Sequence, residues 1–258
     1  MISTRSVGAR VRSSNHHWRH LAACARVAAT ARRQVVARAS ASTDRLQRVL
    51  SDIDSINSQD PRKTTWQGEE LPYELAYSRW LSEWVARLQP SPSDELLIVA
   101  RGQHVARWKS PRDTYPEGRA GYLKWRADLK RAHADTVAGL MAEAGYPEAA
   151  VSRVKRMINK LDLMTDEENQ VVEDALCLVF LEHQFAELLE KEGADKARAG
   201  AGEGRREREG WAPQQTQQRM VDIVRKTWGK MGEKGRAAAL KLALSPAEAD
   251  VVQRALSG

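Results

Sequence analysis

The chain has 258 residues and a formal net charge of +7, but eight of its arginines and none of its acids fall in residues 1–43. Without those eight charges the remainder is close to neutral, so the overall charge gives no argument for nucleic-acid binding by bulk electrostatic attraction. The longest wholly apolar run, residues 175–181, is too short to span a bilayer, so we expect a soluble mature protein with no membrane partner.

Residues 1–43 are also rich in Ala, Ser and Thr. An acid-free, Arg- and Ser-rich start is typical of an organelle transit peptide, and small residues between 37 and 42 suit its removal. We expect import into the chloroplast, with the mitochondrion as the alternative. A disordered basic tail that stays attached is the other interpretation. Since Cys24 falls in this segment, Cys177 would be alone in the mature chain, which excludes an internal disulfide framework.

The rest of the chain has helical periodicity nearly everywhere. The apolar residues between 46 and 56 recur at intervals of three and four, as on one face of a helix. Caps, apolar spacing and Gly or Pro breaks predict further helices over residues 73–88, 93–108, 119–144, 149–160, 166–191, 220–230, 237–244 and 246–256. Residues 58–72 are predicted to be a loop.

No segment alternates convincingly as a strand would, so the expected fold class is all-α: a single multi-helix domain with a C-terminal helical extension. The helical core is expected over residues 44–192. Residues 193–218, which are rich in Gly, Arg and Gln, are predicted to form a flexible insertion, because such a composition cannot bury a core. Residues 219–258 are predicted to form helices that pack on the core.

Two segments, residues 101–109 and 118–135, combine cations, imidazoles and aromatic rings at helical spacing. Such side chains suit a phosphorylated small molecule that carries a ring, such as a nucleotide, and RNA is a further candidate partner. The candidate phosphate-binding residues are Arg79, Arg101, Arg107, Arg112, Arg126 and Lys130. The candidates for stacking on a base are Trp108 and Tyr115.

Four further residues are candidates for catalysis. His104 lies between arginines and an indole, and His133 lies where a cationic stripe on its helix turns into apolar core. Either imidazole could bind phosphate, act as acid or base, or ligate a metal, and either could instead be a buried structural histidine. Glu173 and Asp174 interrupt an apolar helix, so they are expected to be catalytic or to be paired with cations of a neighbouring helix.

Several runs together resemble an uncharacterised family, the domain of unknown function 4202 family. They are residues 73–79 (YELAYSR), 100–108 (ARGQHVARW), 119–126 (RAGYLKWR), 173–182 (EDALCLVFLE) and 223–228 (IVRKTW). The resemblance covers roughly residues 44–258 apart from the insertion, and it implies no established activity.

The order of the helices also resembles that of HD-domain phosphohydrolases, which are helical metalloenzymes named for a His-Asp pair. Gln103-His104 stands in place of that pair, Tyr77-Ser78 stands where the first His would be, and Glu173-Asp174 matches the closing Asp. The resemblance implies a divalent transition metal (Mn, Fe, Ni or Zn) bound by His104, His133 and Asp174, with Glu173 as base or supporting partner.

A metal-dependent phosphohydrolase or phosphotransferase would then use the metal to activate water and the arginines to neutralise phosphate oxygens. Without a metal, His133 paired with Glu173 or Asp174 could still act as base. The alternative is a non-catalytic module that binds a nucleotide or RNA. The catalytic hypotheses share one spatial requirement, that the side chains of His104, His133 and Asp174 lie together in one site.

Overall fold

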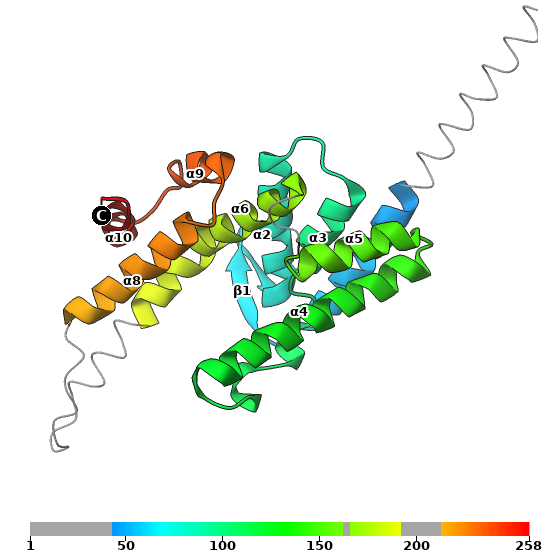
Figure 1. The fold of residues 1–258 in the computed structure, drawn as a ribbon, viewed down its shortest axis with the longest axis horizontal. Helices are drawn as coiled ribbons and strands as arrows, with labels where there is room; N and C mark the ends of the chain where they lie inside the picture. The colour runs from blue at the N-terminus through cyan, green and yellow to red at the C-terminus, as the bar shows by residue number, and fades with distance from the viewer. Residues whose placement is uncertain (1–42, 162–165, 192–212, 258) are drawn as a thin grey trace, which may run out of the picture. The chain divides into compact units, whose positions relative to one another are not determined.

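A computed structural model describes residues 43–161, 166–191 and 213–257. The chain divides into two units, residues 1–47 and residues 48–258, and the described part of the second is helical apart from one short hairpin (Figure 1). After a helix over residues 43–57, the elements are β1 (Lys63–Trp66), β2 (Glu69–Pro72), α2 (Tyr73–Leu88), α3 (Asp94–Gly102), η1 (Arg107–Lys109), η2 (Arg112–Thr114), α4 (Gly118–Glu143), α5 (Glu148–Ile158), α6 (Glu167–Val179), η3 (Phe180–Gln184), α8 (Pro213–Trp228), α9 (Glu233–Ala239) and α10 (Pro246–Leu256). The all-α prediction is confirmed.

The central helix of this unit is α2, which packs against both α3 and α6. Its buried residues include Trp80, Leu81, Trp84 and Val85, which recur at helical spacing and form its core-facing side. Helices α4 and α5 lie side by side (Figure 1), and α5 also contacts α3. Farther along the chain, α9 packs on α6 and α10 packs on α8.

A β-hairpin occupies the segment that the sequence analysis predicted to be a loop. Strands β1 and β2 pair antiparallel, with Trp66 opposite Glu69. The two residues between them, Gln67 and Gly68, both have positive φ, at 51° and 82°. Two-residue turns with φ > 0 at both positions match the twist of paired strands. The alternation signal was missed because each strand has only four residues.

Helix α3 ends at Gly102, six residues before the predicted end at residue 108. Ala106 has φ +56°, a left-handed conformation that an α-helix cannot contain. Gly102 lies against α4 so closely that an added Cβ would be 2.5 Å from Val137 Cγ2. The chain therefore leaves α3 in irregular turns and 3₁₀ helices before it enters α4.

The predicted helix over residues 166–191 contains a π-helical turn, η3, between α6 and a helix over residues 185–191. The predicted transit peptide lies outside the described residues except for Thr43. Most of the predicted insertion, residues 193–218, also lies outside them. The last six residues of the insertion belong to α8, which begins at Pro213. In the described part of the chain, no helix is both long and apolar enough to cross a membrane.

Candidate functional site

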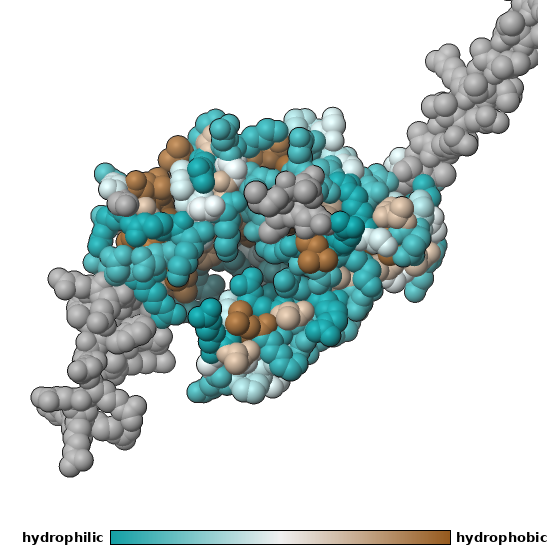
Figure 2. Space-filling view, in the orientation of Figure 1, coloured by the Kyte–Doolittle hydropathy of each residue, from teal (hydrophilic) through white to brown (hydrophobic). Residues whose placement is uncertain are grey.

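A cavity of about 370 Å³ lies where the turn after α3 meets α2, α4 and the α6–η3 helix. Its lining residues are Tyr77, Gln103, His104, Arg107, Tyr122, Trp125, Arg126, Leu129, Lys130, His133, Lys160, Leu176, Phe180 and Gln184. The face drawn in Figure 2 is largely hydrophilic and is hollowed between α4 and α6. We call this cavity the imidazole pocket, after the two histidines in its wall.

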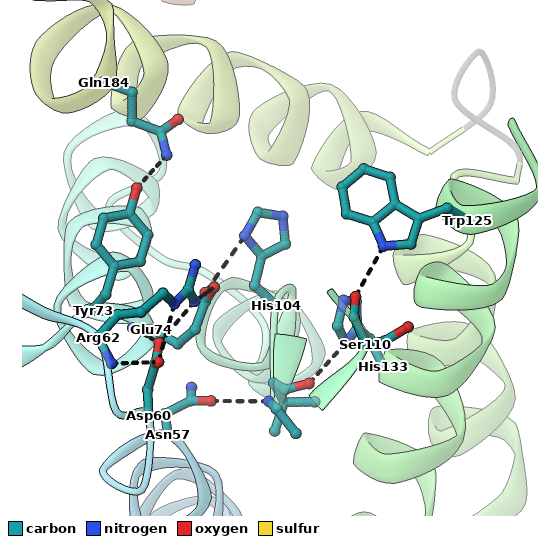
Figure 3. A network of polar contacts seen from close by, with 12 residues as sticks. Asn57, Asp60, Arg62, Tyr73, Glu74, His104, Ser110, Trp125, His133 and Gln184 are labelled. Atoms are coloured by element: carbon teal, nitrogen blue, oxygen red, sulfur yellow. Dashed lines mark hydrogen bonds and ion pairs between the residues drawn. The ribbon is translucent and has the colours of Figure 1, made fainter. Parts of the chain in front are cut away.

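His104 is held by an aromatic ring and a carboxylate of α2. Its ring stacks on Tyr77, with centroids 4.2 Å apart and an interplanar angle of 19°. Its Nδ1 lies 3.8 Å from Oε2 of Glu74, and Figure 3 places the ring between Gln184 and Trp125. Burial, followed by the positive charge of Arg107, lowers the pKa of His104 well below its ordinary value. At neutral pH the imidazole is therefore uncharged, and its contact with Glu74 is not an ion pair.

His133 lies on α4, with its ring centroid 5.9 Å from that of His104. Its Nδ1 lies 2.8 Å from the carbonyl oxygen of Val105. A carbonyl can only accept, so Nδ1 carries the proton and Nε2 is an acceptor. That Nε2 is buried and has no hydrogen-bond partner among the described residues. Burial lowers the pKa of His133 to about 4, so this imidazole is also neutral near pH 7.

Glu74 adds a buried carboxylate that the sequence analysis did not select. Its side chain is fully buried, and its Oε1 accepts a hydrogen bond from Arg62 Nη2 at 2.7 Å (Figure 3). Arg62 also forms a two-point contact with Asp60, whose Oδ2 accepts the backbone N–H of Glu74. Burial raises the pKa of Glu74 to about 7 even though Arg62 opposes the shift. Its Oε2, which faces His104, has no hydrogen-bond partner in the described part of the chain.

The turn that carries His104 and Arg107 contains local backbone strain. Ala106, with φ +56°, stands between these two residues, and a left-handed alanine costs about 1–2 kcal/mol. The amide of Asn57 stabilises the turn, because its Oδ1 accepts the backbone N–H of Ala106 at 3.2 Å (Figure 3). Strained non-glycine residues concentrate at functional sites, where the surrounding structure holds them in place.

Three cations in the imidazole pocket have no carboxylate partner among the described residues: Arg107, Arg126 and Lys130. The Arg107 guanidinium lies 5.0 Å from the centre of the Trp125 ring, and Trp125 Nε1 donates to the Ser110 carbonyl at 2.9 Å. These contacts position Arg107 without neutralising it. Uncompensated cations beside neutral imidazoles make the pocket suited to an anion.

The helical segment that continues α6 contributes the π-helical turn η3 to the pocket wall. Phe180 and Gln184, its first and last residues, both line the imidazole pocket, and Gln184 Nε2 donates to Tyr73 Oη at 2.7 Å. π-Helical turns are rare, and they are frequently found at functional sites. The turn is therefore a second backbone irregularity, besides Ala106, that coincides with this pocket.

Residues 47–200 match the family model described as Domain of unknown function (DUF4202). The chain belongs to the DUF4202 family. No match was found among curated proteins or among solved structures, and the likeness to HD-domain phosphohydrolases finds no support in these comparisons. Every residue that lines the imidazole pocket lies within the part of the chain that the DUF4202 model matches. Helices α8 to α10 lie beyond it.

Of the residues that the sequence predicted for the site, this DUF4202 chain brings five into the imidazole pocket: His104, His133, Arg107, Arg126 and Lys130. Glu173 lies at its margin, where it forms an ion pair with the pocket residue Lys160. The aromatic lining comes from Tyr77, Tyr122, Trp125 and Phe180, not from the predicted pair Trp108 and Tyr115. Tyr115 instead places its Oη 3.2 Å from Asp128 Oδ2.

Asp174 does not join the two imidazoles. Its Oδ1 accepts hydrogen bonds from the backbone N–H of Gly232 at 2.7 Å and from Gln170 Nε2 at 2.8 Å. Its Oδ2 accepts the backbone N–H of Gly235 at 3.2 Å. The carboxylate thus satisfies amides at the start of α9, which would otherwise lack partners. Asp174 therefore fixes α9 to α6, and the predicted convergence of His104, His133 and Asp174 is not seen.

The three remaining predicted arginines also lie outside the lining of the imidazole pocket. Arg112 donates to the carbonyls of Tyr115 and Pro116, so it holds its own loop together. Arg101 pairs with Asp54 at 3.6 Å. Arg79 acts electrostatically on the same carboxylate. Their positive charges therefore serve local structure.

The metal implied by the HD-domain resemblance does not fit these residues. Both carboxylate oxygens of Asp174 accept hydrogen bonds from the backbone amides of α9 and from Gln170, so neither is directed to the imidazoles. Nowhere in residues 43–161, 166–191 and 213–257 do three His, Cys, Asp or Glu side chains come together as metal ligands would.

The acid nearest His104 could have been found from the sequence by one signal. Glu74 lies three and four residues before Tyr77 and Ser78 and seven before Leu81, all of them buried. An acid on the apolar face of a helix needs a partner or an unusual pKa. The run YELAYSR was selected for its resemblance to the family, but the acid within it was not.

Proposed function

We propose that the imidazole pocket binds a phosphorylated molecule that carries a ring, such as a nucleotide, and that the protein hydrolyses the phosphate or transfers it. The observation that supports this most is the group Arg107, Arg126 and Lys130, which has no acidic partner among the described residues and lies beside two neutral imidazoles. Buried imidazoles near guanidiniums are kept neutral, so the net charge offered to a ligand comes from the three cations.

The ligand's phosphate would contact these cations, and its ring would lie against the aromatic side chains of the lining. Arg107 is held in place by Trp125 before a ligand arrives, which lowers the entropy cost of binding. The Nε2 of His133 would accept a hydrogen bond from the ligand, which would satisfy a buried acceptor that has no protein partner.

His104 and Glu74 would supply the proton transfer. A neutral imidazole accepts a proton from the attacking water or hydroxyl while that oxygen bonds to phosphorus and the bond from phosphorus to the leaving oxygen breaks. The carboxylate beside Nδ1 stabilises the imidazolium that results, which then gives its proton to the leaving oxygen. Burial raises the pKa of Glu74 only to about 7, so a large part of its population is ionised at neutral pH and can stabilise that imidazolium. For this stabilisation, the 3.8 Å separation between His104 Nδ1 and Glu74 Oε2 would have to shorten to a hydrogen bond on binding.

The test uses the full chain and isothermal titration calorimetry with AMP, together with release of phosphate from a panel of nucleotides. Arg107→Ala and Lys130→Ala should each weaken AMP binding about ten-fold, because each removes one charge-assisted contact. The matched control is Lys226→Ala, an exposed lysine of α8 outside both the pocket and the DUF4202 match. Equal losses in all three variants would contradict the assignment.

The catalytic part of the proposal is tested by Glu74→Gln, which keeps an oxygen for Arg62 but carries no negative charge beside His104. It should leave AMP affinity within about two-fold and lower turnover by about 10²-fold or more, as expected when the imidazolium of His104 loses the carboxylate that stabilises it. Binding of AMP without turnover of any nucleotide by the wild type would favour the non-catalytic nucleotide- or RNA-binding alternative.

For the location of the protein we propose the chloroplast, on the acid-free, Arg- and Ser-rich composition of residues 1–43. Fusion of these residues to a fluorescent protein should carry it into plastids. Accumulation in mitochondria would select the alternative, and a diffuse signal would indicate a basic tail with no targeting role.

A further inference from the structure

A second cavity, of about 650 Å³, opens on the other side of His104, beside the β-hairpin. It shares His104, Arg107 and Gln184 with the imidazole pocket. Its other lining residues are Arg62, Lys63, Thr64, Tyr73, Glu74, Glu187 and Lys191. We call it the hairpin pocket. The shared residues make the two cavities neighbours across His104 and Arg107, which stand at their junction.

The hairpin pocket is also cationic, and its charges are not all compensated. Arg62 is paired with Asp60 and Glu74, and Lys191 is paired with Glu187. Lys63, an exposed residue at the start of β1, has no ion-pair partner among the described residues. Lys63 and the shared Arg107 therefore present positive charge that the local acids do not neutralise.

We infer that the ligand of the imidazole pocket has an extended anionic arm, which passes His104 and Arg107 and reaches Lys63 in the hairpin pocket. The substrate class is then a nucleotide with a chain of phosphates or with a second phosphorylated group, which present the same chemistry, and not a monophosphate. This inference rests on the proposed function, since it extends the same ligand into the second cavity.

Arg107 is suited to the junction because a guanidinium presents five N–H donors in a planar fork, which can contact oxygens of two successive phosphates. A ligand that filled only the imidazole pocket would leave Lys63 without an anionic contact. The bond to be cleaved would lie beside His104, between the part of the ligand that is held on α4 and the part that is held at the hairpin.

The experiment measures the affinities of AMP and ATP for the full chain by calorimetry in buffer with EDTA. The two probes share base and ribose, so they differ only in the length of the phosphate arm. Wild type should bind ATP about ten-fold more tightly than AMP, as one or two added charge-assisted contacts would produce. Lys63→Ala should lower ATP affinity about five-fold and leave AMP affinity unchanged, whereas Lys226→Ala should change neither.

Equal affinities for the two probes, or ATP affinity unaltered in Lys63→Ala, would overturn the extended arm and leave the proposed function intact. If wild type binds neither probe, the proposed function fails and the inference fails with it. Lys63→Glu gives an independent measure: a reversed charge should weaken ATP binding more than Lys63→Ala does, and an equal or smaller effect would count against contact with the arm.

Discussion

Protonation of His133 should destabilise the folded protein, and the burial of the side chain determines by how much. The side chain is 3% exposed, and burial lowers its pKa from 6.5 to about 4. Between these values the unfolded chain binds a proton that the folded chain does not. The contribution of neutral His133 to the free energy of unfolding is therefore fully present well above pH 6.5, and it is lost as the pH falls through the unfolded pKa. The loss amounts to about 2 kcal/mol between pH 7.5 and pH 5.

The comparison is with His133→Asn, which retains an N–H for the Val105 carbonyl but cannot take up the proton. Urea unfolding followed by tryptophan fluorescence would give the free energy of unfolding of both proteins at pH 7.5 and pH 5. Wild type should lose about 2 kcal/mol more than the variant, and the contribution of His104 should cancel because both proteins contain it. Parallel losses would refute the reasoning that burial keeps His133 neutral.

Three other substitutions test the backbone at Gly235, Gly139 and Ala106. Gly235→Ala should destabilise the protein by about 2–4 kcal/mol in urea unfolding. The alanine Cβ would be 2.5 Å from Asp174 Cγ, so it would displace the Asp174 carboxylate from the amides of α9. A loss below about 1 kcal/mol would count against this contact. Gly139→Ala, within α4 and with nothing within 4 Å of its new Cβ, should instead stabilise by about 0.5–1 kcal/mol, and a lower melting temperature would contradict this. Ala106→Gly should change the free energy of unfolding by less than about 1 kcal/mol, because relief of the strain at φ +56° offsets the greater entropy of the unfolded chain. It should weaken AMP binding about three-fold, because the turn that carries His104 and Arg107 becomes less restricted. Tighter AMP binding in calorimetry would argue against preorganisation of this turn.

The sequence predicted the parts of the site that lie on one helix or in one short run. Arg126, Lys130 and His133 recur at helical spacing along one side of α4, so periodicity alone groups them. His104 and Arg107 lie three residues apart in a turn that is not α-helical, so only their closeness in the sequence groups them. That the two sets meet across one cavity required packing of α4 against α3, which periodicity does not specify.

The buried acids show the limit of this reasoning. A carboxylate on an apolar helix face must have a partner, and the sequence made that requirement clear for Glu173 and Asp174. It did not identify the partners, because they come from distant segments: Lys160 for Glu173, and amides 58 and 61 residues later for Asp174.

Local patterning determined the all-α class and most helix boundaries, because apolar spacing and end caps act over a few residues. Only the tertiary structure decided that the β-hairpin would bring Arg62 to Glu74, and that Glu74 rather than Asp174 would stand beside His104. The physical reason is that a charge buried in a helix must be satisfied, while the group that satisfies it is fixed by which surfaces pack together.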